Sequence, residues 1–190
     1  SDVVANAEKV IADTEIPSEL MVRIGGSYEK QQEMFGDLIM LLIMIIILVY
    51  IVMASQFESF MSPFVIMFSI PFAFVGVLLG LWVTGTPLGT MGMIGILILM
   101  GIVVKNGIVL IDYTILMRER GKSVAEASVI AAKSRLRPIL MTTLTTVLGM
   151  VPMAIGQGEG SEMWRSLGMV VAWGLSISTL VTLVIIPTVY

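Results

Sequence analysis

Three absences narrow the chemistry open to this chain. The sequence contains no cysteine, which excludes disulfide bonds and thiol chemistry within it. It contains no histidine either, so it offers no imidazole base and no histidine ligand for a metal. Charged residues make up only 13% of the 190 residues, whereas hydrophobic residues make up 57%. That imbalance is typical of a protein that crosses a membrane several times and not of a soluble domain.

Long hydrophobic runs account for most of the chain. A helix needs roughly 20 such residues to cross the hydrocarbon core of a bilayer. We therefore expect an all-α membrane protein, a bundle of five transmembrane helices at about residues 38–54, 63–83, 89–117, 138–155 and 167–190. Pro71 falls inside the second run, and Pro138 is expected in the first turn of the fourth. Gly76 and Gly80 form a small-xxx-small pair that allows close helix approach.

The first 36 residues differ in character from the rest. Apolar residues at helical spacing predict an amphipathic helix over about residues 2–13, and residues 20–24 form a strand candidate that ends before two glycines. A segment this short cannot bury a core of its own. We interpret residues 1–36 as the end of a larger α+β domain, which leads into a transmembrane domain over residues 37–190.

Basic residues are concentrated between the third and fourth runs. Residues 118–137 hold six of the eleven lysines and arginines: Arg118, Arg120, Lys122, Lys133, Arg135 and Arg137. The positive-inside rule places this segment in the cytoplasm and residues 1–36 on the outer side, although the loop at 55–62 carries no basic residue to support that orientation. Residues 123–134 predict a helix on the inner membrane surface, opened by a capping box of Ser123 and Glu126.

Lys105 is the most informative residue of the sequence. It lies about 24 Å from the outer end of the third run, if each residue rises 1.5 Å. A lysine in hydrocarbon costs several kcal/mol and usually belongs to an ion or proton pathway, although a lysine near a helix end can also reach the headgroups. Asn106 either bonds to a neighbouring helix or joins the pathway. Asp112 lies on nearly the same helical face as Lys105, and we place it at the inner headgroups.

The fourth run combines hydroxyl groups with preceding arginines. Thr142, Thr143, Thr145 and Thr146 either bond to their own helix, as we expect for most of them, or line a wet seam. Arg135 and Arg137 are candidates for contact with lipid phosphates. The sixteen methionines suit a packed apolar core better than a copper site, and no P-loop pattern is present. We expect neither a metal nor a cofactor.

Four segments resemble a known family. Residues 101–113 (GIVVKNGIVLIDY) and 135–143 (RLRPILMTT) are similar in order and spacing to the resistance–nodulation–division (RND) superfamily, and residues 54–60 and 149–153 also match. Within it, the hydrophobe/amphiphile efflux family of inner-membrane multidrug pumps is the most similar. The resemblance implies that the five runs are the last five helices of a twelve-helix transporter, and that residues 1–36 end its periplasmic porter domain.

The resemblance also implies roles for individual residues. In this family an aspartate pair on a helix of the first half exchanges protons and pairs with a lysine. By motif position Lys105 is that lysine, and Arg135 and Thr142 complete the polar network, to which we add Asn106. The aspartate pair itself is absent from this sequence, so the partner must come from the missing N-terminal half of the transporter.

The resemblance implies a setting as well. It predicts a proton antiporter, not an enzyme, in a bacterial inner membrane, surrounded by lipid. It further predicts a homotrimer that works with a periplasmic adaptor and an outer-membrane channel and binds no nucleic acid. Export of drugs or other amphiphiles is the expected function. A related exporter of metal ions or lipids, or a non-transporting scaffold that assists protein translocation, is the alternative.

Overall fold

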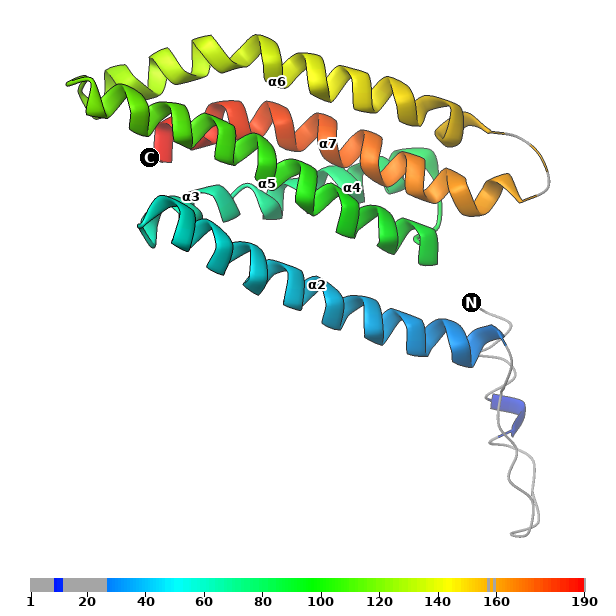
Figure 1. Cartoon of the computed structure of the whole chain (residues 1–190). Coiled ribbons are helices and arrows are strands. Elements are labelled where there is room, and N and C mark those ends of the chain that lie inside the picture. Colours follow the sequence, from blue (N-terminus) through cyan, green and yellow to red (C-terminus); the bar gives the residue numbers. More distant parts are fainter. Residues whose placement is uncertain (1–8, 12–26, 157, 159, 190) are drawn as a thin grey trace. The chain divides into compact units, whose positions relative to one another are not determined.

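The computed structural model describes residues 9–11, 27–156, 158 and 160–189. Its helices are α2 (Ser27–Phe57), α3 (Met61–Met67), α4 (Ile70–Thr84), α5 (Thr90–Glu119), α6 (Val124–Ile155) and α7 (Ser161–Val189) (Figure 1). The chain divides into two compact units, Ser1–Met40 and Leu41–Tyr190, and α2 contributes residues to both. The first unit contains residues 9–11, which are helical, and the start of α2; the strand candidate at 20–24 lies outside the described residues.

Five stretches of the described chain are long and apolar enough to cross a membrane: Glu33–Phe57, Met61–Thr84, Thr90–Glu119, Val124–Ile155 and Ser161–Thr188. Helices form here because a backbone in hydrocarbon must satisfy its own hydrogen bonds. The predicted all-α bundle of five transmembrane helices is confirmed, and the molecule is a multi-pass membrane protein.

The second transmembrane stretch consists of two helices. α3 ends at Met67, Phe68 and Ser69 form a turn, and α4 begins at Ile70 with Pro71 in its first turn. The sequence predicts one continuous span through Pro71. A proline cannot donate to the carbonyl four residues earlier, here that of Met67, and its ring crowds that carbonyl. The chain therefore breaks one turn before the proline, and the Ser69 hydroxyl donates to the Ile66 carbonyl at 2.6 Å.

The fourth transmembrane stretch corrects a second expectation. Residues 123–134 do not form a separate helix, because α6 runs without interruption from Val124 to Ile155 and passes through Pro138. Ala127 and Ala131 are fully buried, so one face of the start of α6 packs against the rest of the unit. The capping box is confirmed: the Glu126 amide donates to the Ser123 hydroxyl at 3.3 Å, and the Ser123 amide donates to the Glu126 carboxylate at 3.4 Å.

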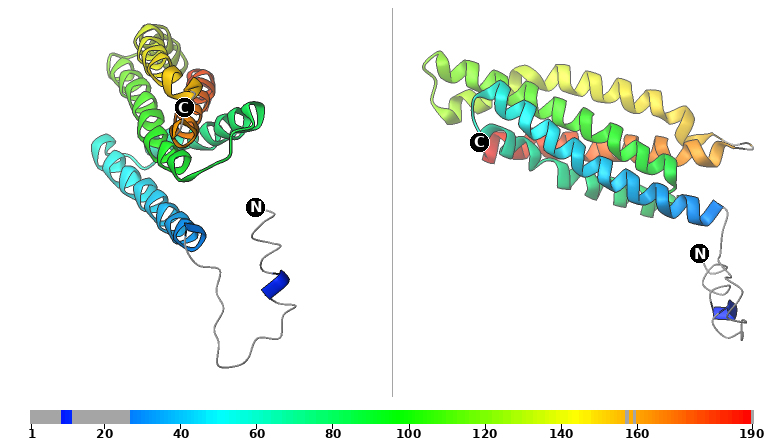
Figure 2. Two further views of the ribbon diagram at one scale, coloured as in Figure 1. Left: turned by 90° about the vertical axis from the view of Figure 1, so that its right-hand side faces the viewer. Right: turned by 60° about the horizontal axis from the view of Figure 1, so that its bottom comes forward.

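Helix α7 is the centre of the second unit and packs against α4, α5 and α6 (Figure 2). Glycines permit the closest of these contacts. A Cβ atom on Gly76 would lie 2.9 Å from the Ile177 Cβ, and one on Gly80 would overlap the Trp173 side chain. The predicted small-xxx-small pair therefore brings α4 against α7, as expected for helices held together in lipid by close backbone packing.

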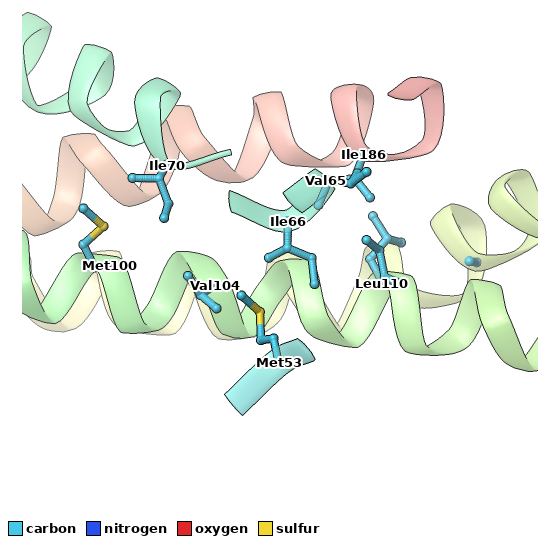
Figure 3. Packing of buried hydrophobic residues seen from close by; sticks show 10 residues of the cluster. Met53, Val65, Ile66, Ile70, Met100, Val104, Leu110 and Ile186 are labelled. Atoms are coloured by element: carbon cyan, nitrogen blue, oxygen red, sulfur yellow. The ribbon is translucent and has the colours of Figure 1, made fainter. Parts of the chain in front are cut away.

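A buried apolar cluster packs α5 against α2, α3 and α7. Met53 of α2 lies beside Val104 of α5, while Ile66 and Ile186 close the cluster from α3 and α7 (Figure 3). This packing fixes which faces of α5 are covered, and therefore which face remains open.

Candidate functional site

Lys105 lies on the open face of α5. Exposed residues follow one another along this helix at intervals of three, four or seven, which places them on a single stripe: Ile98, Gly101, Lys105, Asp112 and Leu116. The stripe runs along a helix that is otherwise largely buried. Within the described residues, the structure records no ion pair or hydrogen bond to the Lys105 ammonium group. A membrane-crossing helix thus presents an unpaired cation on its uncovered face.

The neighbours of α5 flank this stripe on both sides. On one side, Val104 belongs to the buried cluster that contains Met53 of α2. On the other side, the ring of Tyr113 lies beneath Arg135 of α6, with the Arg135 Cζ atom 4.7 Å from the ring centroid. The stripe therefore faces outward between α2 and α6.

Arg135 is held against α5 and does not reach into open space. Its side chain is half-buried, and its Nε is buried with no hydrogen-bond partner in the described part of the chain. A guanidinium over an aromatic face gains roughly 0.5–2 kcal/mol, depending on how far water is excluded. Within the described residues, the partner of Arg135 is the ring of Tyr113, and contact of Arg135 with lipid phosphate stays a prediction.

Thr142 is exposed two helical turns beyond Arg135, on the same side of α6. Its hydroxyl donates to the backbone carbonyls of Pro138 at 3.2 Å and Ile139 at 3.0 Å. Thr145 and Thr146 also donate to carbonyls of α6, which is the local bonding expected for most of these threonines. Thr143 differs, because its hydroxyl lies 3.2 Å from that of Thr179 on α7.

Lys105 and Thr142 lie at the same level of the bundle. α5 and α6 are adjacent and antiparallel, and the contact of Arg135 with Tyr113 fixes their register. Lys105 lies eight residues before Tyr113 on α5, and Thr142 lies seven residues after Arg135 on α6. At 1.5 Å per residue, Lys105 and Thr142 are displaced from this contact by about 12 and about 10 Å along the helix axes, in the same direction because the helices are antiparallel. Both side chains border the open side of the α5–α6 pair.

Asn106 does not join this face. It is 7% exposed and follows Lys105 by one residue, so it points about 100° away around α5. That direction is shared with Leu99, whose side chain lies where a Cβ on Gly174 of α7 would be. The structure thus separates Asn106 from the other three predicted site residues and directs it toward the interior.

Two partners were not foreseen from the sequence. Tyr113 follows the predicted Asp112 directly, and an aromatic ring at the inner end of a span is a common interfacial residue. Only the register of α5 against α6 shows that it receives Arg135. The pairing of Thr143 with Thr179 likewise needs the packing of two helices that are 36 residues apart in sequence.

Comparison with known proteins links this arrangement to membrane transporters. The sequence model of the AcrB/AcrD/AcrF family matches residues 1–190. The swarming motility protein SwrC of Bacillus subtilis is 40% identical over 189 residues, which cover 99% of this chain and 18% of that protein. The cobalt-zinc-cadmium resistance protein CzcA of Cupriavidus metallidurans is 35% identical over 188 residues, which cover 98% of this chain and 18% of that protein.

Two further comparisons extend this likeness. The multidrug resistance protein MdtC of Proteus mirabilis is 35% identical over 191 residues, covering all of this chain and 19% of that protein. Among solved structures, a crystal structure of a heavy metal efflux pump is similar over all of this chain, with a TM-score of 0.84 and 32% identity, and the match covers 19% of that pump. The chain thus spans about a fifth of the length of these relatives.

Proposed function

The chain belongs to the AcrB/AcrD/AcrF family of RND transporters, and from this premise we propose that it is the C-terminal transmembrane portion of an efflux transporter driven by proton antiport. The observation that carries the proposal is Lys105 on the open stripe of α5, where no described residue pairs with its ammonium group. Translocon measurements put the cost of a lysine at a helix centre at about 2.5–3.5 kcal/mol. A carboxylate from another part of the full-length transporter would offset that cost.

The proposed coupling follows from the charge on that carboxylate. When the acid is ionised, it attracts Lys105 and holds the open face of α5 against the helix that carries it. When the acid takes up a proton, this attraction is lost and the ammonium group must find other partners. Thr142 lies level with Lys105 and offers a hydroxyl oxygen, while Arg135 keeps a second positive charge nearby. A proton is thereby converted into a change of helix packing.

The proposed substrates are drugs or other amphiphilic compounds, as the resemblance to multidrug pumps implies. MdtC, whose name describes multidrug resistance, supports this choice. CzcA and the heavy metal efflux pump are about equally similar to this chain and favour divalent metal ions as the second candidate. The proposed setting is a homotrimer in a bacterial inner membrane that works with a periplasmic adaptor and an outer-membrane channel.

Growth tests on the full-length transporter examine the function and the substrate class together. A host without its own pumps would carry the wild type, the Lys105→Ala variant, or Lys122→Ala as a matched control on the exposed turn after α5. We expect the wild type and Lys122→Ala to raise tolerance to amphiphilic drugs, and Lys105→Ala to return tolerance to that of the empty host at equal membrane expression.

Tolerance to cobalt, zinc and cadmium salts instead of drugs would assign the metal branch. Full resistance in the Lys105→Ala variant would contradict the proposed role of this lysine. If the wild type gives resistance to neither class and its cellular effect does not depend on the proton gradient, the protein is a non-transporting scaffold.

A further inference from the structure

The side of α6 that faces away from Arg135 and Thr142 carries an open groove. Its volume is about 760 Å³. All of its lining comes from α6: Lys133, Leu136, Arg137, Leu140, Met141, Leu144, Thr145 and Leu148. Leu144 lies two residues beyond Thr142, which places it about 200° around the helix. The groove is therefore separate from the proposed proton site.

The groove has a charged end and an apolar end. Lys133 and Arg137 lie one turn apart at the end nearer the start of α6, and both are exposed. The other end is lined by large apolar side chains, of which Met141 is 71%, Leu144 58% and Leu148 60% exposed. No acidic residue contributes to the lining. Two like charges on one helix face repel each other, so an anion between them would be stabilised.

The length of the groove fits one leaflet of a bilayer. Eleven residues separate Arg137 from Leu148, which corresponds to about 16 Å along the helix. One leaflet contributes about half of a hydrocarbon core roughly 30 Å thick. The cationic end of the groove lies at about the same depth as the contact of Arg135 with Tyr113, near the end of α5. The sequence predicts that this end of α5 is at the cytoplasmic interface. The lining of the groove therefore changes from cationic to apolar along α6, in the same order in which a phospholipid of the inner leaflet changes from its charged headgroup to its acyl chains.

We propose that this groove binds an anionic phospholipid from the cytoplasmic leaflet. Lys133 and Arg137 hold its phosphate, and one acyl chain lies along Leu140, Leu144 and Leu148. Charge complementarity selects an anionic over a zwitterionic headgroup, since the groove supplies two cations and no counter-charge. The proposal does not depend on the direction of transport or on the substrate.

Photolabelling of the full-length transporter tests this site. The protein would be placed in phosphatidylcholine nanodiscs that contain a small fraction of phosphatidylglycerol with a photoactivatable acyl chain, and the labelled peptides would be mapped. We expect labelling of residues 140–148. The double variant K133Q/R137Q should lower it about twenty-fivefold, since each cation near a membrane contributes on the order of fivefold in affinity.

Two further variants keep the result unambiguous. R118Q/K122Q removes the same charge from exposed positions outside the groove and should leave labelling within about twofold of wild type. Leu144→Trp fills the apolar end without changing charge and should also reduce labelling.

Three results would overturn the proposal. One is equal labelling of K133Q/R137Q and wild type, and another is equal labelling by photoactivatable phosphatidylcholine. The third is a cross-link between a photoreactive amino acid introduced in place of Leu144 and another part of the transporter. Such a cross-link would show that protein covers the groove.

Discussion

At the scale of single residues, the open face of α5 gathers its polar groups from two helices. Lys105 comes from α5, Thr142 lies level with it on α6, and Arg135 is held below them by the ring of Tyr113. Among the residues that the structure describes, the arginine is therefore oriented by an aromatic face and not by a carboxylate. We expect this contact to keep Arg135 in place while the charge proposed to lie opposite Lys105 changes.

Replacement of Tyr113 tests this orientation. Tyr113→Phe keeps the ring and should leave transport close to wild type. Tyr113→Leu removes the aromatic face and should cost about 0.5–2 kcal/mol of the interaction with Arg135. Thermal unfolding in detergent and the transport rate would be measured on the full-length protein. Equal behaviour of the two variants would show that the ring does not position the arginine.

Two threonines of α6 form a matched pair for a second test. Thr142 and Thr145 are both exposed and both donate to their own helix, but only Thr142 shares the side of Arg135. Thr142→Ala should lower the transport rate, whereas Thr145→Ala should not, since loss of a local helix bond alone has little effect on stability. An equal loss of transport in both variants would assign the effect to α6 as a whole.

Lys105 could be identified from the sequence because a charged side chain inside a long apolar run costs free energy in hydrocarbon and is therefore rare. It could not identify the contact of Tyr113 with Arg135, since that contact depends on the register of two antiparallel helices. Asn106 shows the same limit. The sequence left open whether it bonds to a neighbouring helix or joins the pathway, and the structure shows it buried and about 100° around α5 from Lys105.

At the scale of helices, hydrophobic length predicted where the chain crosses the membrane, but prolines were harder to interpret. Pro71 follows a break between α3 and α4, whereas Pro138 lies within an unbroken α6. Burial does not separate the two cases, because Ile66 and Ile70 beside the break are buried, as are Ala127 and Ala131 at the start of α6. A proline in the sequence predicts one missing backbone bond, and only the structure shows whether the helix ends there.

The α4–α7 contact provides a stability test at this scale. Gly80→Ala places a Cβ against Trp173 of α7, and such overpacking typically costs about 1–3 kcal/mol. We expect a lower midpoint of thermal unfolding in detergent. Gly36→Ala is the control, because no atom lies within 4 Å of the added Cβ, and it should be neutral or slightly stabilising. An unchanged midpoint for Gly80→Ala would show that α4 and α7 are less tightly packed.

At the scale of the whole molecule, the five membrane-crossing stretches present Lys105 without a partner among the described residues, and the chain accounts for about a fifth of the length of the related transporters. Their charge distribution predicts the sidedness of the chain. Single cysteines introduced at Lys122 and at Ser161 of an otherwise cysteine-free full-length protein would test it. A membrane-impermeant thiol reagent should label position 161 in spheroplasts and position 122 only after the membrane is opened. The reverse pattern would invert the proposed orientation.

The most direct test of the central claim is substrate-dependent proton movement in proteoliposomes that contain the full-length transporter. Lys105→Met removes the charge but keeps an apolar chain of similar length, and Lys122→Met makes the same change on the exposed turn. We predict that wild type and Lys122→Met move protons when substrate is added, and that Lys105→Met does not, although it still binds substrate. Proton movement by Lys105→Met at the wild-type rate would contradict the claim that this lysine couples protons to transport.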